Sequence, residues 1–274
     1  MAMASWTRIL LPALLLALLQ IPRTTATASD HGRRETIDPP SVSIFFNIDD
    51  LKPGNRMPIY FSNKKPSNSP HLLSKQESDS IPFSSSHLES LLELFSFSRG
   101  SAHARAVEST LTLCELEPMA GETKFCATSL ESMLDSVRSS FGHETQLRAL
   151  ATTTHSARPV DDGLGSGLGS VRNYTILKEP EQILTRKVMG CHTMPYPYLV
   201  YYCHSPAGET KLFRVLLGGE GDGGVVEAVA LCHMDTSKWD RDNPSFRVLK
   251  MVPGEGPVCH FFPRFDIVWA ALPV

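Results

Sequence analysis

The sequence lacks the features that identify nucleic-acid-binding and membrane proteins. Its formal net charge is only −3 over 274 residues, which gives no electrostatic reason to expect a nucleic acid as partner. After the N-terminal segment no apolar run approaches the thickness of a bilayer, so we expect no membrane span in the mature chain. With 42% hydrophobic and 20% charged residues, the composition predicts a soluble globular protein with its own core.

Familiar catalytic and metal-binding motifs are also absent. There is no Gly-x-Ser-x-Gly segment, which excludes the common hydrolase nucleophile turn. His143 and Glu144 are not followed by the second histidine of a zinc-protease helix, and the glycine-rich segment 161–170 matches neither a P-loop nor a dinucleotide-binding fingerprint. No Cys-x-x-Cys occurs, which disfavours a structural zinc site. The sequence therefore identifies no catalytic residue.

The first 28 residues predict export from the cell. Arg8 precedes the apolar run 9–21, and Ala26-x-Ala28 follows it, as in a cleaved secretory signal peptide. The run is too short to span a bilayer comfortably, so a retained anchor is the weaker alternative. We expect a signal peptide over residues 1–28 and a secreted mature protein, in which the sequon at Asn173 is a predicted glycosylation site.

All six cysteines lie after the predicted cleavage site. An even number of cysteines in an exported chain favours disulfide bonds. The sequence leaves their pairing open, although the proximity of Cys114 and Cys126 makes a local bridge between them one candidate. The six residues are Cys114, Cys126, Cys191, Cys203, Cys232 and Cys259.

The first half of the chain predicts a pair of short strands and then helices. Two apolar patches in residues 45–61 flank a Lys-Pro-Gly-Asn turn, which predicts strand, turn and strand. Leucines recur at helical spacing in residues 85–97, where Ser86 and Glu89 form a capping-box pattern. Residues 102–115 are the second predicted helix.

The third predicted helix has the clearest signals. Thr128 and Glu131 form another capping-box pattern, and Gly142 is a typical helix terminator. The apolar residues at helical spacing are Leu130, Met133, Leu134, Val137 and Phe141. We interpret this stripe as core packing.

The second half of the chain predicts strands. Six segments after Tyr174 are short, rich in β-branched or aromatic residues and separated by Gly, Pro, Asn or Asp: YPYLVYYCH, KLFRVLLGG, VVEAVALCHMD, FRVLKMV, PVCHFF and FDIVWA. We interpret segment 161–170 as a linker or mobile loop before this half. The predicted fold class is α+β, in which a helical N-terminal part packs with a C-terminal antiparallel β-sheet that carries four Cys-His pairs.

Four of the six cysteines are followed directly by a histidine. Successive side chains of a strand point to opposite faces, so each pair should send its thiol to one side and its imidazole to the other. In one sheet, four such pairs would build a layer of sulfurs suited to two bridges and a layer of imidazoles. The histidines are His192, His204, His233 and His260.

Four converging imidazoles predict a metal site. Protonated rings repel one another, and neutral rings leave nitrogen atoms that need partners. A metal ion resolves both problems, and an all-nitrogen site suits copper, zinc or nickel, of which copper binds most tightly. We therefore expect these four histidines to be metal ligands and interpret the other six as solvated.

The spacing of the pairs resembles the signature of the plant BURP domain. Ten, 27 and 25 residues separate successive Cys-His pairs. The segments CELEPMAGETKFCATSLESMLD, YPYLVYYCH and CHMDTSKWD are also similar to family segments. The resemblance predicts a BURP domain over residues 45–272, preceded by a short polar segment, 29–44. It also predicts a short form of the family without N-terminal repeats.

The resemblance implies an exported plant protein of the cell wall or apoplast, with a role in development or stress response. One branch of the family consists of non-catalytic subunits of a pectin-degrading enzyme. Another consists of copper-dependent cyclases that crosslink Tyr or Trp side chains of peptides, and there the histidines of the pairs bind copper. Segment 29–44 contains no Tyr or Trp, so no peptide for cyclisation is evident within this chain.

Three functions follow from this resemblance. We expect first a secreted protein that binds a cell-wall component or a peptide and has a four-histidine copper site. The first alternative is an oxidative cyclase that acts on a separate peptide. The second alternative is a non-catalytic subunit of an enzyme that degrades cell-wall polysaccharide. Neither catalysis nor the oligomeric state follows from the sequence.

Overall fold

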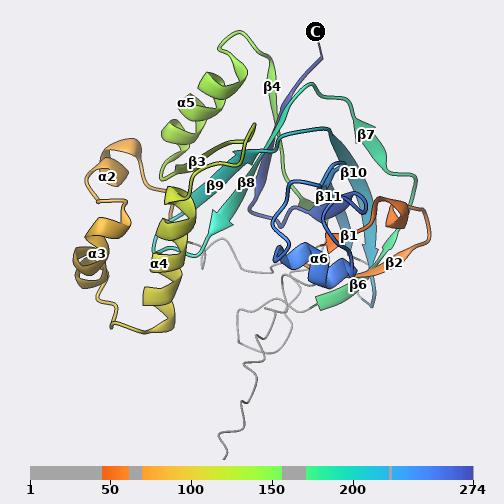
Figure 1. The fold of residues 1–274 in the computed structure, drawn as a ribbon. Coiled ribbons are helices and arrows are strands. Elements are labelled where there is room, and N and C mark those ends of the chain that lie inside the picture. The colour runs from red at the N-terminus through yellow and green to blue at the C-terminus, as the bar shows by residue number, and fades with distance from the viewer. Residues whose placement is uncertain (1–44, 62–69, 156–170, 222–223, 274) are drawn as a thin grey trace, which may run out of the picture. The chain divides into compact units, whose positions relative to one another are not determined.

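The structure, a computed structural model, combines helices with two antiparallel sheets (Figure 1). It describes residues 45–61, 70–155, 171–221 and 224–273. The predicted signal peptide, the polar segment 29–44 and the glycine-rich segment lie outside these ranges. In the part of the chain that is described, no helix is both long and apolar enough to cross a membrane. The predicted mixture of helices and antiparallel strands is confirmed.

The helices are α2 (Lys75–Asp79), α3 (Leu88–Leu94), α4 (Ala102–Glu115), α5 (Leu130–Phe141) and α6 (Pro244–Leu249), with 3-10 turns η1 (Ile48–Asp50) and η3 (Ser85–His87). The strands before the glycine-rich segment are β1 (Phe45–Phe46), β2 (Arg56–Tyr60), β3 (Thr123–Ala127), β4 (Leu147–Leu150) and β5 (Thr153–Thr154). The later strands are β6 (Val171–Ile176), β7 (Glu181–Ile183), β8 (Val188–Met194), β9 (Val200–Ser205), β10 (Thr210–Gly219), β11 (Val225–His233), β12 (Val258–Phe261) and β13 (Ile267–Ala271).

The Cys-His pairs lie on two sheets, and the prediction that they share one sheet is wrong. The eight-stranded sheet has the order β1-β12-β11-β10-β6-β2, with β5 beside β11 and β7 beside β10. The five-stranded sheet has the order β3-β9-β8-β13-β4. The chain crosses between the sheets after β12, because β12 pairs with β11 whereas β13 pairs with β8. Alternation along a strand shows which residues share a face, but it does not show which other strand pairs with it. The sequence therefore cannot reveal this crossing.

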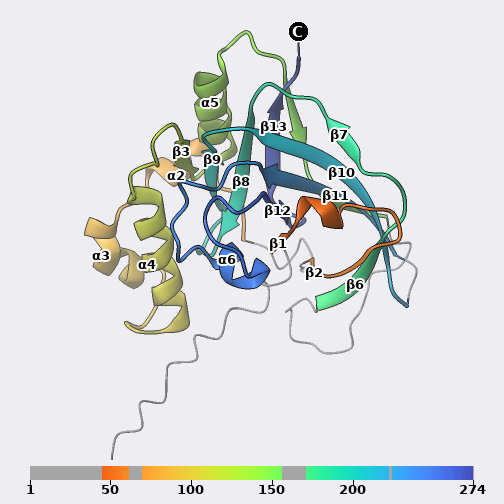
Figure 2. The same cartoon turned by 45° about the vertical axis from the view of Figure 1, so that its right-hand side comes forward.

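Helix α4 occupies the predicted range, 102–115. It begins at Ser101, whose hydroxyl accepts a hydrogen bond from the backbone N–H of Ala104. Its buried face includes Val107 and Leu111, which pack with α3 and with Tyr196 and Tyr198 from the turn between β8 and β9. Helix α4 thereby covers one end of the five-stranded sheet (Figure 2).

Both predicted capping boxes are misplaced. Helix α3 begins after His87, which makes no side-chain capping bond, and Ser84 instead caps the preceding 3-10 turn. Helix α5 is capped by Ser129, which exchanges hydrogen bonds with Ser132, one residue beyond the predicted position. Where several Ser and Thr residues are adjacent, the backbone conformation decides which oxygen meets the free N–H groups. Gly142 ends α5 at a φ of 94°, as predicted.

Residues 246–252, predicted as a strand, belong mainly to helix α6 and the turn after it. Asn243 caps this helix through the N–H of Ser245, and Pro244 occupies its first turn. A short apolar run does not distinguish a strand from a buried helix by periodicity alone. The predicted segments did not include β3, β4, β5, β6, β7 or β8, so Cys191 and His192 lie on a strand that the sequence analysis missed.

Each sheet contributes to an apolar cluster of its own, and a third cluster, which includes Val188, Leu212 and Val268, joins the two sheets. Helix α5 packs on the five-stranded sheet through Met133 and Val137, which share a buried cluster with Met189, Cys191 and Cys203. The stripe predicted for α5 is therefore core-facing at its centre, whereas Leu130 at its start is exposed. The buried cluster on the eight-stranded sheet is a separate one and includes Cys232 and Cys259.

Candidate metal centre

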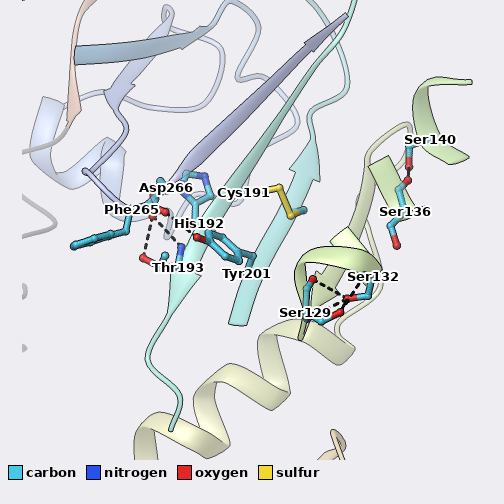
Figure 3. Close-up of a disulfide and its surroundings, with 11 residues drawn as sticks. Ser129, Ser132, Ser136, Ser140, Cys191, His192, Thr193, Tyr201, Phe265 and Asp266 are labelled. Atoms are coloured by element: carbon cyan, nitrogen blue, oxygen red, sulfur yellow. Dashed lines mark hydrogen bonds and ion pairs between the residues drawn. A yellow bond between two sulfur atoms is a disulfide. The ribbon is translucent and has the colours of Figure 1, made fainter. Parts of the chain in front are cut away.

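Strand alternation separates each cysteine from the histidine that follows it. Figure 3 shows the disulfide of Cys191 and the ring of His192 on opposite sides of β8. Cys191 lies directly opposite Cys203 of β9, and Cys232 lies directly opposite Cys259 of β12. Register therefore brings two cysteines together on one face of a strand pair and two histidines to the other face.

The structure contains three disulfides, which resolve the pairing that the sequence left open. Cys191 bonds to Cys203 and Cys232 bonds to Cys259, each across a strand pair with 3.9 Å between Cα atoms. The candidate local bridge between Cys114 and Cys126 is also present and joins α4 to β3. The predicted single layer of sulfurs is wrong, because the two cross-strand disulfides lie in the cores of different sheets.

The four imidazoles converge from the two sheets. Ring centroids are 5.6 Å apart for His192 and His204, which lie on β8 and β9. They are 5.5 Å apart for His233 and His260, which lie on β11 and β12. Across the sheets, His192 is 5.6 Å from His260 and His204 is 6.5 Å from His233. Each ring is therefore next to two of the other three, and the four imidazoles form one cluster.

Two buried carboxylates hold the rings of the β8–β9 pair. Nδ1 of His192 lies 2.8 Å from Oδ2 of Asp266 (Figure 3). Nδ1 of His204 lies 2.9 Å from Oε1 of Glu122. A carboxylate only accepts, so Nδ1 carries the proton in both rings and Nε2 keeps its lone pair. Metal-binding histidines are typically held in this way.

The sequence analysis did not identify Asp266 or Glu122. They lie 74 and 82 residues from the histidines that they contact. Neither belongs to a Cys-His pair, and no spacing rule relates an acidic residue to a histidine at such distances. Asp266 also accepts hydrogen bonds from the backbone N–H and the hydroxyl of Thr193, so its own position is fixed.

The β11–β12 pair is more deeply buried, and within the part of the chain that the structure describes it has no carboxylate partner. His233 and His260 are 4% and 7% exposed, and their Nε2 atoms are 3.4 Å apart. Two nitrogen ligands of one tetrahedral ion, each about 2.0–2.1 Å from it, are separated by about this distance. Nδ1 of His233 is buried and has no hydrogen-bond partner among the described residues, which is unusual for a polar atom in a protein interior.

Burial lowers the pKa of three of the four imidazoles. The pKa of His233 falls to about 3, because burial penalises the charged ring and the neighbouring imidazoles add repulsion. Burial and repulsion from His233 also hold the pKa of His260 well below its ordinary value. Burial lowers the pKa of His204 and outweighs the opposing effect of Glu122. These rings are neutral at pH 7, the form in which imidazole binds metals.

The metal-free protein should lose stability as the pH falls from 7 to 5. The unfolded chain protonates these histidines below a pKa of about 6.5, whereas the folded rings resist protonation until a much lower pH. This difference should lower the free energy of unfolding below about pH 7 and leave it unchanged above that pH. For His233 alone, the loss should reach about 2 kcal/mol at pH 5. Urea unfolding at both pH values measures this loss.

Two variants test the origin of that pH dependence. His233→Asn should reduce the difference between pH 7 and pH 5, because it removes one buried titrating ring. His143→Asn should not change it, because His143 is exposed. Equal stability of the wild-type protein at the two pH values would contradict the burial of neutral rings.

Gly190 makes room for the rings beside the cluster. The fully buried Phe262 stacks on His192 with centroids 4.9 Å apart and lies 4.8 Å from His260. A Cβ atom at residue 190 would lie 2.9 Å from a ring carbon of Phe262 and 3.4 Å from Nε2 of His192. The close approach of the Phe262 ring therefore requires glycine here.

Gly190→Ala should destabilise the protein by about 1–3 kcal/mol, because Phe262 has no free space into which to move. It should also weaken metal binding, since His192 stacks on the displaced ring. Gly256→Ala is the control, because its added methyl group meets only the flexible end of Met251. Urea unfolding measures both variants, and wild-type stability of Gly190→Ala would contradict the packing argument.

A pocket of about 400 Å³ opens beside the four rings. All four histidines contribute to its lining, together with Glu122. Its other walls carry mainly aromatic and apolar side chains, which include Phe45, Leu113, Leu116, Met119, Tyr202 and Trp239, and the polar residues Glu117, Lys124, Asp240 and Asn243 also line it. Trp239 lies against His233 with centroids 4.8 Å apart, and Tyr202 lies 5.2 Å from His204. The cluster is therefore accessible from an apolar cavity.

The cluster is not a completed coordination shell. Within residues 45–61, 70–155, 171–221 and 224–273, no three His, Cys, Asp or Glu side chains already have the geometry of a metal site. The donor set nevertheless fits a metal of the copper, zinc or nickel type, because burial keeps three of the imidazoles neutral and carboxylates orient two of the rings. An ion would have to draw the rings closer together.

Asn173 lies at an exposed position on β6, where it is paired with Pro58 of β2. Its side-chain amide donates a hydrogen bond to Glu220. The position is accessible, and glycosylation of this sequon remains a prediction.

The fold and the cluster define a class of protein: a disulfide-bonded chain of helices and antiparallel strands, in which four Cys-His pairs lie on strands and their imidazoles converge. This chain belongs to the BURP domain family, whose profile matches residues 44–271. The resemblance inferred from the sequence is therefore confirmed.

Named plant proteins are similar over most of the chain. Identity to the BURP domain protein USPL1 of Arabidopsis thaliana is 42% over 232 residues, which are 85% of this chain and 81% of that protein. Identity to the BURP domain-containing protein BNM2A of Brassica napus is 44% over 232 residues, 85% of this chain and 80% of that protein. Protein RAFTIN 1B of Triticum aestivum is 32% identical over 239 residues, 87% of this chain and 61% of its own length.

Proposed function

We propose that this protein is a secreted plant BURP protein of the apoplast or cell wall whose four histidines bind one copper ion. The observation that carries the proposal is the pair of carboxylates at Nδ1 of His192 and His204. They fix the tautomer that leaves Nε2 free toward the cluster, and a packing role alone gives no reason for this arrangement. The family resemblance supports a role in development or stress response.

Copper fits the donor set best. Imidazoles bind copper, zinc and nickel, and copper forms the strongest complexes among divalent first-row metals. The ligands would be His192, His204, His233 and His260, with Glu122 and Asp266 as the partners that orient two of them. When bound, copper would supply one-electron redox chemistry beside the apolar pocket.

Secretion is supported by the disulfides. All six cysteines are paired, and such bonds persist in oxidising compartments and are rare in the cytosol. The predicted signal over residues 1–28 agrees with this. The full-length chain, expressed in plant cells, should release its mature form into the medium, and retention inside the cell would contradict secretion.

Titration of the purified mature protein with Cu(II) tests the metal site. One equivalent should bind, and electron paramagnetic resonance should show coordination by imidazole nitrogen. Binding at the affinity of the folded protein should be lost after the protein is unfolded in urea with its disulfides intact, because the sheets assemble the ligands. The absence of a site with nitrogen ligands would reject the proposal.

A second candidate function is oxidation of aromatic side chains in a separate peptide. The observation that favours it is the pocket of about 400 Å³, which places apolar walls beside all four histidines. Copper-loaded protein is offered peptides that contain Tyr or Trp under oxygen. Loss of two hydrogen atoms per crosslink, detected by mass spectrometry, would support an enzyme. Copper binding without turnover over a broad peptide set would favour a binding protein.

A further inference from the structure

We propose that Glu122 is a positioning residue with two partners: it orients His204 in the metal centre and fixes one wall of the adjacent pocket. Metal binding and the order of this wall are then coupled. The inference rests on the proposed metal function for its metal-dependent part. Its metal-independent part depends only on the contacts of Glu122.

The wall is the segment 113–124, most of which lies inside the loop closed by the disulfide of Cys114 and Cys126. Six residues of this segment line the pocket: Leu113, Leu116, Glu117, Met119, Glu122 and Lys124. Leu116 and Met119 are 56% and 47% exposed, which is high for large apolar side chains. This wall therefore presents apolar surface directly beside the histidines.

The carboxylate of Glu122 connects the wall to the metal centre through its two oxygens. Oε1 accepts the hydrogen bond from Nδ1 of His204 at 2.9 Å. Oε2 accepts a hydrogen bond from the backbone N–H of Met119 at 3.0 Å. The backbone N–H of Glu122 in turn donates to the carbonyl of Met119, which closes a turn. The side chain of Glu122 is only 5% exposed, so water competes little for its contact with His204, whereas its contact with the N–H of Met119 lies at the surface.

These contacts couple the two sites. A metal ion on Nε2 of His204 withdraws electron density from the ring and makes Nδ1–H a stronger donor to Glu122. A more firmly held carboxylate keeps Oε2 in place for the N–H of Met119, which orders the turn. By linkage, a wall that is already ordered raises the affinity for the metal by the same factor.

Asp266 is the matched control within the same chain. It holds Nδ1 of His192 just as Glu122 holds that of His204. Its other contacts, however, go to Thr193, which directly follows His192 on β8. Asp266 therefore orients a ring without touching the wall.

Only a carboxylate can serve both partners of Glu122, because both donors need an acceptor. A glutamine has one acceptor oxygen, and its NH₂ group faces the second donor. Glu122→Gln therefore either releases the N–H of Met119 or drives His204 into the tautomer that protonates Nε2. In both cases the coupling between the ring and the wall is lost.

Hydrogen exchange of the Met119 amide, measured by NMR with the diamagnetic ion Zn(II), tests the proposal. In the wild-type protein, saturating Zn(II) should slow this exchange by about fivefold or more. Asp266→Asn should bind Zn(II) about 10–100-fold more weakly and still slow the exchange at saturation. Glu122→Gln should show a similar loss of affinity with no slowing at saturation. If Glu122→Gln does not fold, Glu122→Asp, which is too short to reach both donors, replaces it.

Failure of the coupling is distinguishable from failure of the metal site. If Zn(II) binds to the wild-type protein and Met119 exchanges at the same rate, the coupling is wrong. If neither Zn(II) nor Cu(II) binds, the proposed metal function fails. In metal-free protein, Met119 should exchange faster in Glu122→Ala, which removes both acceptor oxygens, than in the wild-type protein or Asp266→Asn. Equal rates in all three would overturn the wall-fixing role of Glu122.

Discussion

His204→Ala is expected to lower the affinity for Cu(II) by more than about 100-fold, because loss of a ligand should exceed the 10–100-fold effect of losing an orienting partner. The substitution removes one of the two imidazoles that a carboxylate holds with Nε2 free. It also leaves the carboxylate of Glu122 buried without its ring donor. Competition against a chelator of known affinity at pH 7 measures the change.

The control for this result is His143→Ala, which removes an exposed histidine outside the pocket lining and should not alter copper affinity. Near-UV circular dichroism of the metal-free variants checks that the tertiary packing is retained. Unchanged copper affinity in a folded His204→Ala protein would show that the four-histidine site is misassigned.

Removal of the disulfide between Cys191 and Cys203, by substituting both with Ala, is expected to lower the free energy of unfolding by about 2–5 kcal/mol. The bond closes a loop with a sequence separation of 12 and lies fully buried against α5. The double substitution avoids a free thiol. Urea unfolding of the metal-free protein measures the loss, and reduced secretion should accompany it.

The disulfide between Cys114 and Cys126 provides the comparison, because its sequence separation is also 12. It joins α4 to β3, the strand beside β9, and neither of its cysteines adjoins a proposed ligand in the chain, whereas Cys191 and Cys203 directly precede two of them. Loss of the Cys191–Cys203 bond should therefore weaken Cu(II) binding in addition to stability. Wild-type stability of the Cys191→Ala/Cys203→Ala protein would contradict a structural role for this bond.

Local features of the fold were predictable because their causes lie within a few neighbouring residues. The range of α4 follows from its helical spacing, and the end of α5 follows from Gly142. The opposite directions of Cys191 and His192 follow from strand geometry and need no partner strand. The same alternation identified His192, His204, His233 and His260, which the structure brings together.

What the sequence determined by itself was therefore the set of residues on each face: sulfur on one side, imidazole on the other, in a repeated spacing that identifies the family. The tertiary structure decided which strands pair, and so which cysteines bond and which sheets supply the rings. It also decided that Glu122 and Asp266, 82 and 74 residues from their histidines, hold two of those rings. The physical reason is that backbone geometry acts over a few residues, whereas hydrogen bonds and sheet register depend on proximity in space.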